Sequence, residues 1–238
     1  MPASLAETRA AARRELLAAG FAADDVDASL AVTRAAMFFA LAPEAPEETI
    51  PLGASKIGGN PDLADGTSWP NGATAFLLQI NLADVPEGVL DIALTREGLL
   101  SCFLNKGSQV TLIWNKPGSN LTRHVQTPSA KRFEARLLAA TILLTLNIDD
   151  RNLPAVEDEE IFDVIEDWSV PENGVQLGGN RKVIARGEAP DMYLILQIGS
   201  LDEIGMIWGT LGCLTVSMRP EDIAARAFER VVSAIQSF

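Results

Sequence analysis

Two glutamines stand at matching places in a pattern that this chain contains twice. Gln79 lies within a Leu-Gln-Ile segment at 78–80, and Gln197 lies within the same segment at 196–198. Apolar residues surround both, and a buried amide that lacks hydrogen bonds costs about 1–3 kcal/mol. Each amide must therefore bond to the backbone, to another side chain or to a ligand. Two interpretations follow: the glutamines lock strands together, or they face each other across a groove and hold a ligand.

A Gly-Gly-Asn turn precedes each glutamine, at 58–60 and at 178–180, so that Asn60 and Asn180 are equivalent. Paired glycines reach positive φ and expose N–H groups that suit an anion, and Lys56 adds a positive charge beside the first turn. Neither turn has the spacing of a phosphate-binding loop. The turns therefore predict tight chain reversals, and they leave Asn60, Asn180 and Lys56 as ligand-binding candidates.

Other residues capable of chemistry are few. Trp69 and Trp208 flank the two copies and are candidates for the wall of a groove, although large aromatic side chains more often fill a core. His124 is the only histidine, and Cys102 and Cys213 lie far apart inside apolar runs. This set provides neither a usual zinc site nor a clear nucleophile and base. The sequence therefore predicts no metal and no cofactor, and it favours a protein without enzymatic activity.

Acidic residues gather in one segment. Residues 149–173 hold ten acids and one base, whereas 101–148 hold six bases and one acid. The candidates for binding a protein partner are Glu157, Asp158, Glu159 and Glu160. These acids either begin a helix, where the positive end of the helix dipole favours them, or form a surface that attracts a basic protein. The formal net charge of −13 argues against nucleic-acid binding, because nucleic acids are polyanions.

The repeat also predicts the fold, because its matching segments are offset by 114 to 120 residues, about half the chain. Such a period indicates two copies of one supersecondary unit related by an approximate two-fold axis. We expect an internally duplicated α+β domain over 50–238. Its β-rich half-units lie at about 50–148 and 174–238, joined by the acidic helical segment 149–173. The groove between the copies is then the expected ligand site.

Residues 1–49 are expected to form a helical hairpin and a linker. Ser4 and Glu7 make a capping box for the first helix, and the second helix begins at Asp24 or Asp25 and stops before Pro43. Its apolar spacing runs over Val26, Leu30, Thr33 and Met37. Later elements are strands at 75–80, 99–104, 110–114, 137–146, 193–198, 213–218 and 230–235, a helix at 157–168 and a short helix from Pro220.

The composition bounds the location of the protein. No apolar run reaches the length of a membrane span, and the N-terminus lacks the basic start and apolar core of a secretory signal. The two isolated cysteines are typical of a reducing compartment. We therefore expect a cytoplasmic protein that binds neither membranes nor nucleic acids, and the oligomeric state stays open.

Three blocks of residues resemble a known family. Residues 55–63 with Gly66 and Trp69-Pro70 resemble the opening signature of the bacterial YwqG-like proteins; 75–80 with 98–103 is similar to their second block, and 196–198, 205–209 and 219–228 to their last. The resemblance covers most of the chain from about Pro51. It implies a duplicated α+β fold in a domain of unknown function, and some such proteins are suspected of serving in toxin–immunity loci. Thr210 and Val175 stand where the family often has an acid and a histidine, which lowers the expectation of a shared catalytic site.

Two hypotheses of function follow from these observations. The first is a non-enzymatic binding module that holds a basic protein through Glu157–Glu160, in the manner of an immunity protein. The alternative is a small-ligand-binding protein or an enzyme that uses the groove between the repeats.

Overall fold

In the computed structural model, the described residues are 4–126, 130–146, 153–169, 174–181, 192–210 and 212–236. The strands of a large sheet are β1 (Arg34–Leu41), β2 (Lys56–Ile57), β4 (Ala73–Asn81), β5 (Leu99–Asn105), β6 (Val110–Asn115), β8 (Arg136–Thr145), β9 (Val175–Leu177), β10 (Tyr193–Gly199), β11 (Cys213–Met218) and β12 (Val232–Gln236). A small sheet consists of β3 (Asp62–Ala64) and β7 (Leu121–Arg123). The α-helices are α1 (Leu5–Ala19), α2 (Ala23–Ala31), α3 (Glu160–Ser169) and α4 (Pro220–Ala225). Short 3-10 turns are η1 (Glu47–Thr49), η2 (Leu82–Asp84), η3 (Lys106–Ser108), η4 (Asp202–Ile204) and η5 (Phe228–Arg230).

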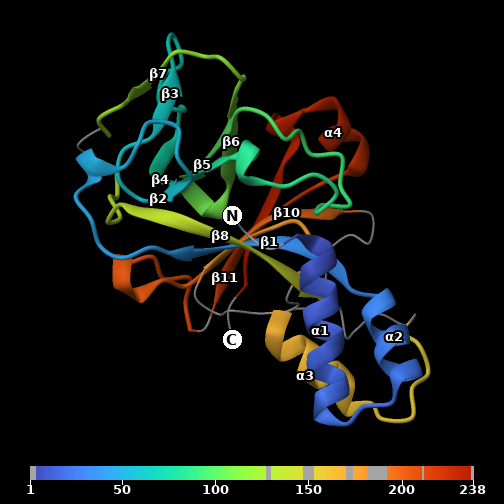
Figure 1. The fold of residues 1–238 in the computed structure, drawn as a ribbon. Coiled ribbons are helices and arrows are strands. Elements are labelled where there is room, and N and C mark those ends of the chain that lie inside the picture. Colours follow the sequence, from blue (N-terminus) through green and yellow to red (C-terminus); the bar gives the residue numbers. More distant parts are fainter. Residues whose placement is uncertain are drawn as a thin grey trace.

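The large sheet has ten antiparallel strands in the order β12-β11-β10-β9-β1-β8-β2-β4-β5-β6 and is nearly barrel-shaped (Figure 1). Helices α1, α2 and α3 form a group at one side of the sheet. The protein is therefore a mixed α+β fold that is mostly β, as the sequence predicts at this level.

Most local predictions are confirmed. Ser4 caps α1 through a capping box with Glu7, and Gly20 ends the helix at φ 103°. The predicted strands all form within two residues of their expected bounds. The predicted acidic helix is α3, although it begins at Glu160 rather than at 157.

The predicted second helix is wrong beyond Ala31. Helix α2 ends at Ala31, and Arg34–Leu41 is the strand β1 in the middle of the large sheet. Met37 lies opposite Ile142 on one side and Leu177 on the other. A strand with neighbours on both sides and cover on both faces is apolar throughout, so its sequence does not alternate and looks like a buried helix. The sheet consequently includes residues on both sides of the boundary expected at residue 49.

The large sheet divides into two sets of five strands at the β1–β8 pair. We name β8-β2-β4-β5-β6 the first half-sheet and β12-β11-β10-β9-β1 the second half-sheet. The N-terminal strand β1 belongs to the second half-sheet, and β8, from later in the chain, belongs to the first. Strand β8 lies within the expected first half-unit, 50–148, whereas the second half-sheet includes β1 from before residue 49. This strand from the N-terminal part of the chain makes the sheet a single folding unit.

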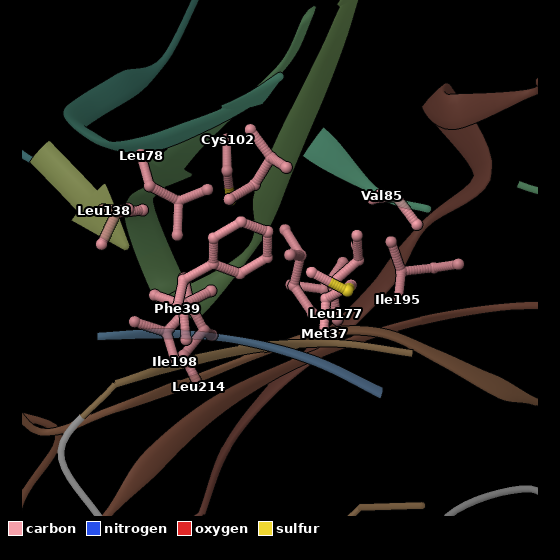
Figure 2. Close-up of a cluster of buried hydrophobic side chains, with 14 of the residues drawn as sticks. Met37, Phe39, Leu78, Val85, Cys102, Leu138, Leu177, Ile195, Ile198 and Leu214 are labelled. Carbon is pink, nitrogen blue, oxygen red and sulfur yellow. The ribbon is translucent and has the colours of Figure 1, made fainter. Parts of the chain in front are cut away.

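The space between the half-sheets is filled by a shared hydrophobic core. Figure 2 shows Phe39 of the second half-sheet, beside Ile198 and Leu214, with its ring directed toward Leu78 and Cys102 of the first, so both half-sheets contribute to one cluster. These side chains are at most 4% exposed except for their neighbour Leu138, at 7%. The segment that follows η2 adds Val85 to the same cluster. The interior that the repeat predicted as a groove is therefore packed with apolar side chains.

Candidate functional site

A buried polar cluster lies on the outer face of the first half-sheet, beneath the small sheet. Lys56 and Asp62 are both 0% exposed, and Lys56 Nζ lies 3.3 Å from Asp62 Oδ1. Nζ also donates to the backbone oxygen of Asn60 at 2.5 Å and lies 3.7 Å from Glu47 Oε1. Burying a charged group costs free energy unless partners compensate the charge, so the fold must supply the partners of both Lys56 and Asp62.

The Asp62 carboxylate is the centre of the cluster. It accepts hydrogen bonds from Arg123 Nε at 2.9 Å, Gln79 Nε2 at 2.8 Å and the Gly53 N–H at 3.0 Å. Arg123 also donates to the backbone oxygens of Glu47 and Ile50, at 2.7 and 2.9 Å. The cluster thus joins the segment before β2 to both strands of the small sheet.

The pKa values of the central groups respond to this environment. Burial lowers the pKa of Lys56, and the nearby Arg123 acts in the same direction, while Asp62 and Glu47 oppose it. Burial alone would raise the pKa of Asp62, but hydrogen bonds from Arg123, Gly53 and Gln79 outweigh burial, and the pKa is lowered. Asp62 is therefore held as a carboxylate.

Gln79 takes part in this cluster rather than in a groove. Its Nε2 donates to the Ala54 backbone oxygen as well as to Asp62, and its Oε1 accepts the Asp62 N–H at 2.9 Å. Leu78 points into the shared core, so alternation places Gln79 on the outer face. Internal bonds thus occupy this amide.

Gln197 does not face Gln79, which corrects the expectation from the repeat. Strands β4 and β10 are separated by four other strands in the sheet. Ile198 points into the shared core, so its neighbour Gln197 lies on the outer face of the second half-sheet. The two glutamines therefore point away from the interior on opposite half-sheets.

Both Gly-Gly-Asn turns reverse the chain against a neighbouring segment. Gly58 and Gly59 have φ of 66° and 67°, and a Cβ on Gly58 would lie 2.1 Å from the Glu134 oxygen. Asn60 donates from its backbone and its side chain to the Glu47 carboxylate, at 2.5 and 3.0 Å. The glycines thus permit a close approach that no side chain would allow.

The second turn makes the same contacts with neutral partners. Asn180 donates from its backbone to Thr145 Oγ1 at 2.7 Å and from its side chain to the Thr145 oxygen at 3.0 Å. Gln176 occupies the place of Lys56 and donates to the Asn180 oxygen at 2.6 Å. At the second turn, an amide and a hydroxyl therefore take the places of the ammonium and the carboxylate at the first turn.

The two candidate tryptophans pack against other residues of the protein and do not form the wall of a groove. Trp69 packs edge-on against Phe103 at 5.2 Å and donates to the Ala73 oxygen. Trp208 is 5% exposed and donates to the Gly199 oxygen at 3.2 Å. Each indole N–H is thus paired inside the protein.

The four predicted partner-binding acids are exposed. The Glu157 N–H donates to Asp25 of α2, which fixes the start of the acidic segment on that helix. Along α3, Glu160, Asp163 and Asp167 are exposed at i, i+3 and i+7, opposite the buried Ile161 and Ile165. We name the exposed acids Glu157, Asp158, Glu159, Glu160, Asp163 and Asp167 the acidic face.

An open hollow lies beside the polar cluster, with a volume of about 640 Å³. Its lining consists of Glu44, Ala45, Pro46, Glu47, Glu134 and Ala135. Arg132 pairs with Glu47 at 2.8 Å, and Arg136 pairs with Glu134 at 2.8 Å. Arginines therefore neutralise part of its acidic lining.

Sequence reasoning missed the partners that complete the polar cluster. Asp62 lay in the block that resembles the family's opening signature but was given no role, and Glu47 lay in an expected linker. Arg123, next to His124, lay outside every predicted helix and strand. The one available hint was Lys56 beside Ile57 and the first glycine turn, because a lysine that becomes buried in a strand requires a carboxylate.

Comparison with protein families matches residues 55–236 to a domain of unknown function (DUF1963). The chain belongs to this family. The matched region contains all strands of the large sheet except β1, together with the small sheet and the acidic face. No curated protein matches the chain.

Two further findings concern metals and membranes. Within the described ranges, no three His, Cys, Asp or Glu side chains are grouped so as to hold a metal ion. The helices in the same ranges are too short or too polar to cross a membrane.

Proposed function

We propose that this protein is a binding module that holds a basic partner protein on its acidic face. The observation that supports this proposal is that basic residues of the described structure do not neutralise the acidic face. Acids elsewhere, such as Asp27, Asp91 and Asp222, form ion pairs with arginines at 2.5–2.7 Å. No described residue forms an ion pair with an acid of the acidic face.

The packing of α3 supports this proposal. Ile161, Phe162 and Ile165 are buried, so the helix is anchored by its apolar side and presents its acids to solvent. Closely spaced charges of one sign raise the encounter rate with an oppositely charged partner and select against acidic proteins. Neutralisation of a basic toxin by an immunity protein is one role of this kind, and it suits the resemblance to YwqG-like proteins.

A charge-reversal experiment tests the proposal. One variant changes Glu157, Asp158, Glu159 and Glu160 to lysine; the matched control changes Glu87, Glu203, Glu221 and Glu229, which are also exposed, so that both variants have the same net charge. Each is tagged, cross-linked in the native cell and purified with its partners. We expect a basic protein to accompany the wild type and the control variant and to be lost from the acidic-face variant. The same partners on all three proteins would contradict the proposal.

We also propose that the two half-sheets are copies of one unit. The strand order supports this proposal, because β2, β4, β5 and β6 follow β8 as β9, β10, β11 and β12 follow β1. Ladder registers agree as well: Ile57 lies opposite Leu78, as Leu177 lies opposite Leu196. The equivalent strands β4 and β10 each have a shift in ladder register at the matching place, between residues 76 and 78 in β4 and between 194 and 196 in β10.

Substitution of Thr145 tests whether the two turns are equivalent, as this second proposal requires. If Glu47 and Thr145 are equivalent acceptors, Thr145→Ser retains the stability of the second turn, because only the hydroxyl is needed. A stability loss as large as that of Thr145→Val would contradict the equivalence.

A further inference from the structure

The small sheet forms a flap over the outer face of the first half-sheet. Strands β3 and β7 pair only with each other and lie apart from the large sheet in Figure 1. Leu63 of β3 packs on Phe76 and Phe103 in a separate apolar cluster. This cluster is small beside the shared core, so apolar packing alone holds the flap weakly.

Asp62 is the centre of the polar attachment of the flap. Arg123 of β7 adds bonds to the backbone oxygens of Glu47 and Ile50, and the Ala64 N–H of β3 donates to Asn115 Oδ1 at 2.9 Å. Three donors to the Asp62 carboxylate come from outside the flap: Lys56 Nζ at 3.3 Å, Gln79 Nε2 at 2.8 Å and the Gly53 N–H at 3.0 Å. The fourth donor, Arg123, belongs to β7 and moves with the flap. One carboxylate therefore connects the flap to three fixed donors.

The face beneath Asp62 has the chemistry of a receptor for carboxylic acids. Lys56 and Gln79 lie directly opposite each other on β2 and β4, and Ser101 lies opposite Gln79 on β5. The Ser101 hydroxyl is buried and has no hydrogen-bond partner in the described structure. Phe76 and Phe103 continue the same face as an aromatic surface. An ammonium, an amide and a spare hydroxyl beside aromatic rings fit a carboxylate attached to an apolar body.

We propose that the flap is a lid and that Asp62 occupies the position of a ligand carboxylate, so that a small carboxylic acid with an apolar body displaces Asp62 and holds the lid open. The ligand site then consists of Lys56, Gln79 and Ser101 with the Phe76 and Phe103 rings. This ligand site lies on the outer face of the first half-sheet, remote from the acidic face. The proposed ligand site is therefore independent of the proposed binding of a basic partner.

The first experiment asks whether the position accepts a free carboxylate. Asp62→Ala vacates it, and the melting temperature is measured against increasing acetate, with acetamide as the neutral probe of the same shape. We expect acetate to raise the melting temperature of Asp62→Ala well above the effect of acetamide, and we expect no such difference for Asp62→Asn, which fills the position. An equal response to acetate and acetamide, or the same acetate response in Asp62→Asn, would overturn the site.

The second experiment asks whether the lid opens in the unaltered protein. Hydrogen exchange of β3 and β7 is measured with phenylacetate and with phenylacetamide. We expect phenylacetate to accelerate exchange in both strands by about tenfold or more, while β1 and β8 in the centre of the large sheet are unchanged. Exchange that is equal with the two probes would overturn the lid, even if Asp62→Ala binds acetate, because Asp62 would then never leave its place.

Discussion

Replacing Lys56 with methionine tests whether the buried ion pair stabilises the first half-sheet. The Lys56 side chain is fully buried, and its Nζ lies 3.3 Å from Asp62 Oδ1 and 3.7 Å from Glu47 Oε1. Methionine is flexible, similar in length and uncharged, so the substitution removes the charge and largely retains the packing.

The expected loss follows from what remains around Asp62. Removing one partner of a buried ion pair costs about 3–5 kcal/mol, because the other charge stays buried without compensation. Asp62 keeps its bonds to Arg123, Gln79 and the Gly53 N–H, so we expect the lower limit, about 3 kcal/mol. In a protein of this size that loss lowers the melting temperature by roughly 6–12 °C.

Urea unfolding followed by tryptophan fluorescence measures the free energy of unfolding, provided that the denaturant slope is unchanged. Lys116→Met is the control, because Lys116 is exposed, and it should change stability by no more than about 0.5 kcal/mol. The double variant Lys56→Met with Asp62→Asn should lose about 1–3 kcal/mol less than the two single losses together. A loss below about 1 kcal/mol in Lys56→Met, or strict additivity in the double variant, would refute the reasoning.

Three further predictions concern the same region and its counterpart, all measured by unfolding. The pKa of Asp62 is lowered from 3.8, so the contribution of this carboxylate to stability is present above pH 3.8 and is lost as the pH falls through the lower folded-state pKa. Asp62→Asn should therefore make the free energy of unfolding less sensitive to acid. An unchanged acid profile would contradict this prediction. Gly58→Ala places a Cβ 2.1 Å from the Glu134 oxygen and should cost about 3 kcal/mol or more, whereas Gly66→Ala, at similar φ with no atom within 4 Å, should cost about 1 kcal/mol; equal losses would argue against the close approach. Thr145→Val removes the acceptor for the Asn180 N–H and should cost about 1–3 kcal/mol, while a loss near zero would show that another acceptor replaces it.

The predictability of the candidate site differs from residue to residue. The sequence correctly identified Gln79 as a buried amide that must be satisfied, because its apolar neighbours are visible in the chain. It did not identify Asp62, Glu47 and Arg123 as the satisfying groups, since they are separated from Gln79 by 17 to 44 residues. Which polar groups meet depends on how β3 and β7 fold back over the sheet, and local patterns carry no signal for that contact.

The strand β1 shows a related limit. Its apolar run is compatible with a buried helix or a buried strand, and only its two neighbours in the sheet decide between them. Ala40 lies opposite Ala139 at the centre of the sheet, where the two half-sheets meet. The N-terminal helix pair forms, but the predicted continuation of its second helix over β1 failed because pairing between distant segments overrode local periodicity.

The sequence by itself determined the capped start of α1, the two glycine turns and the places of most strands, because caps, positive φ and apolar runs act within a few residues. Tertiary structure alone decided that β1 joins the second half-sheet, that the predicted groove is a packed core, and that the glutamines point outward. Those outcomes depend on which faces become buried against each other, and burial is a property of the assembled sheet rather than of any one segment.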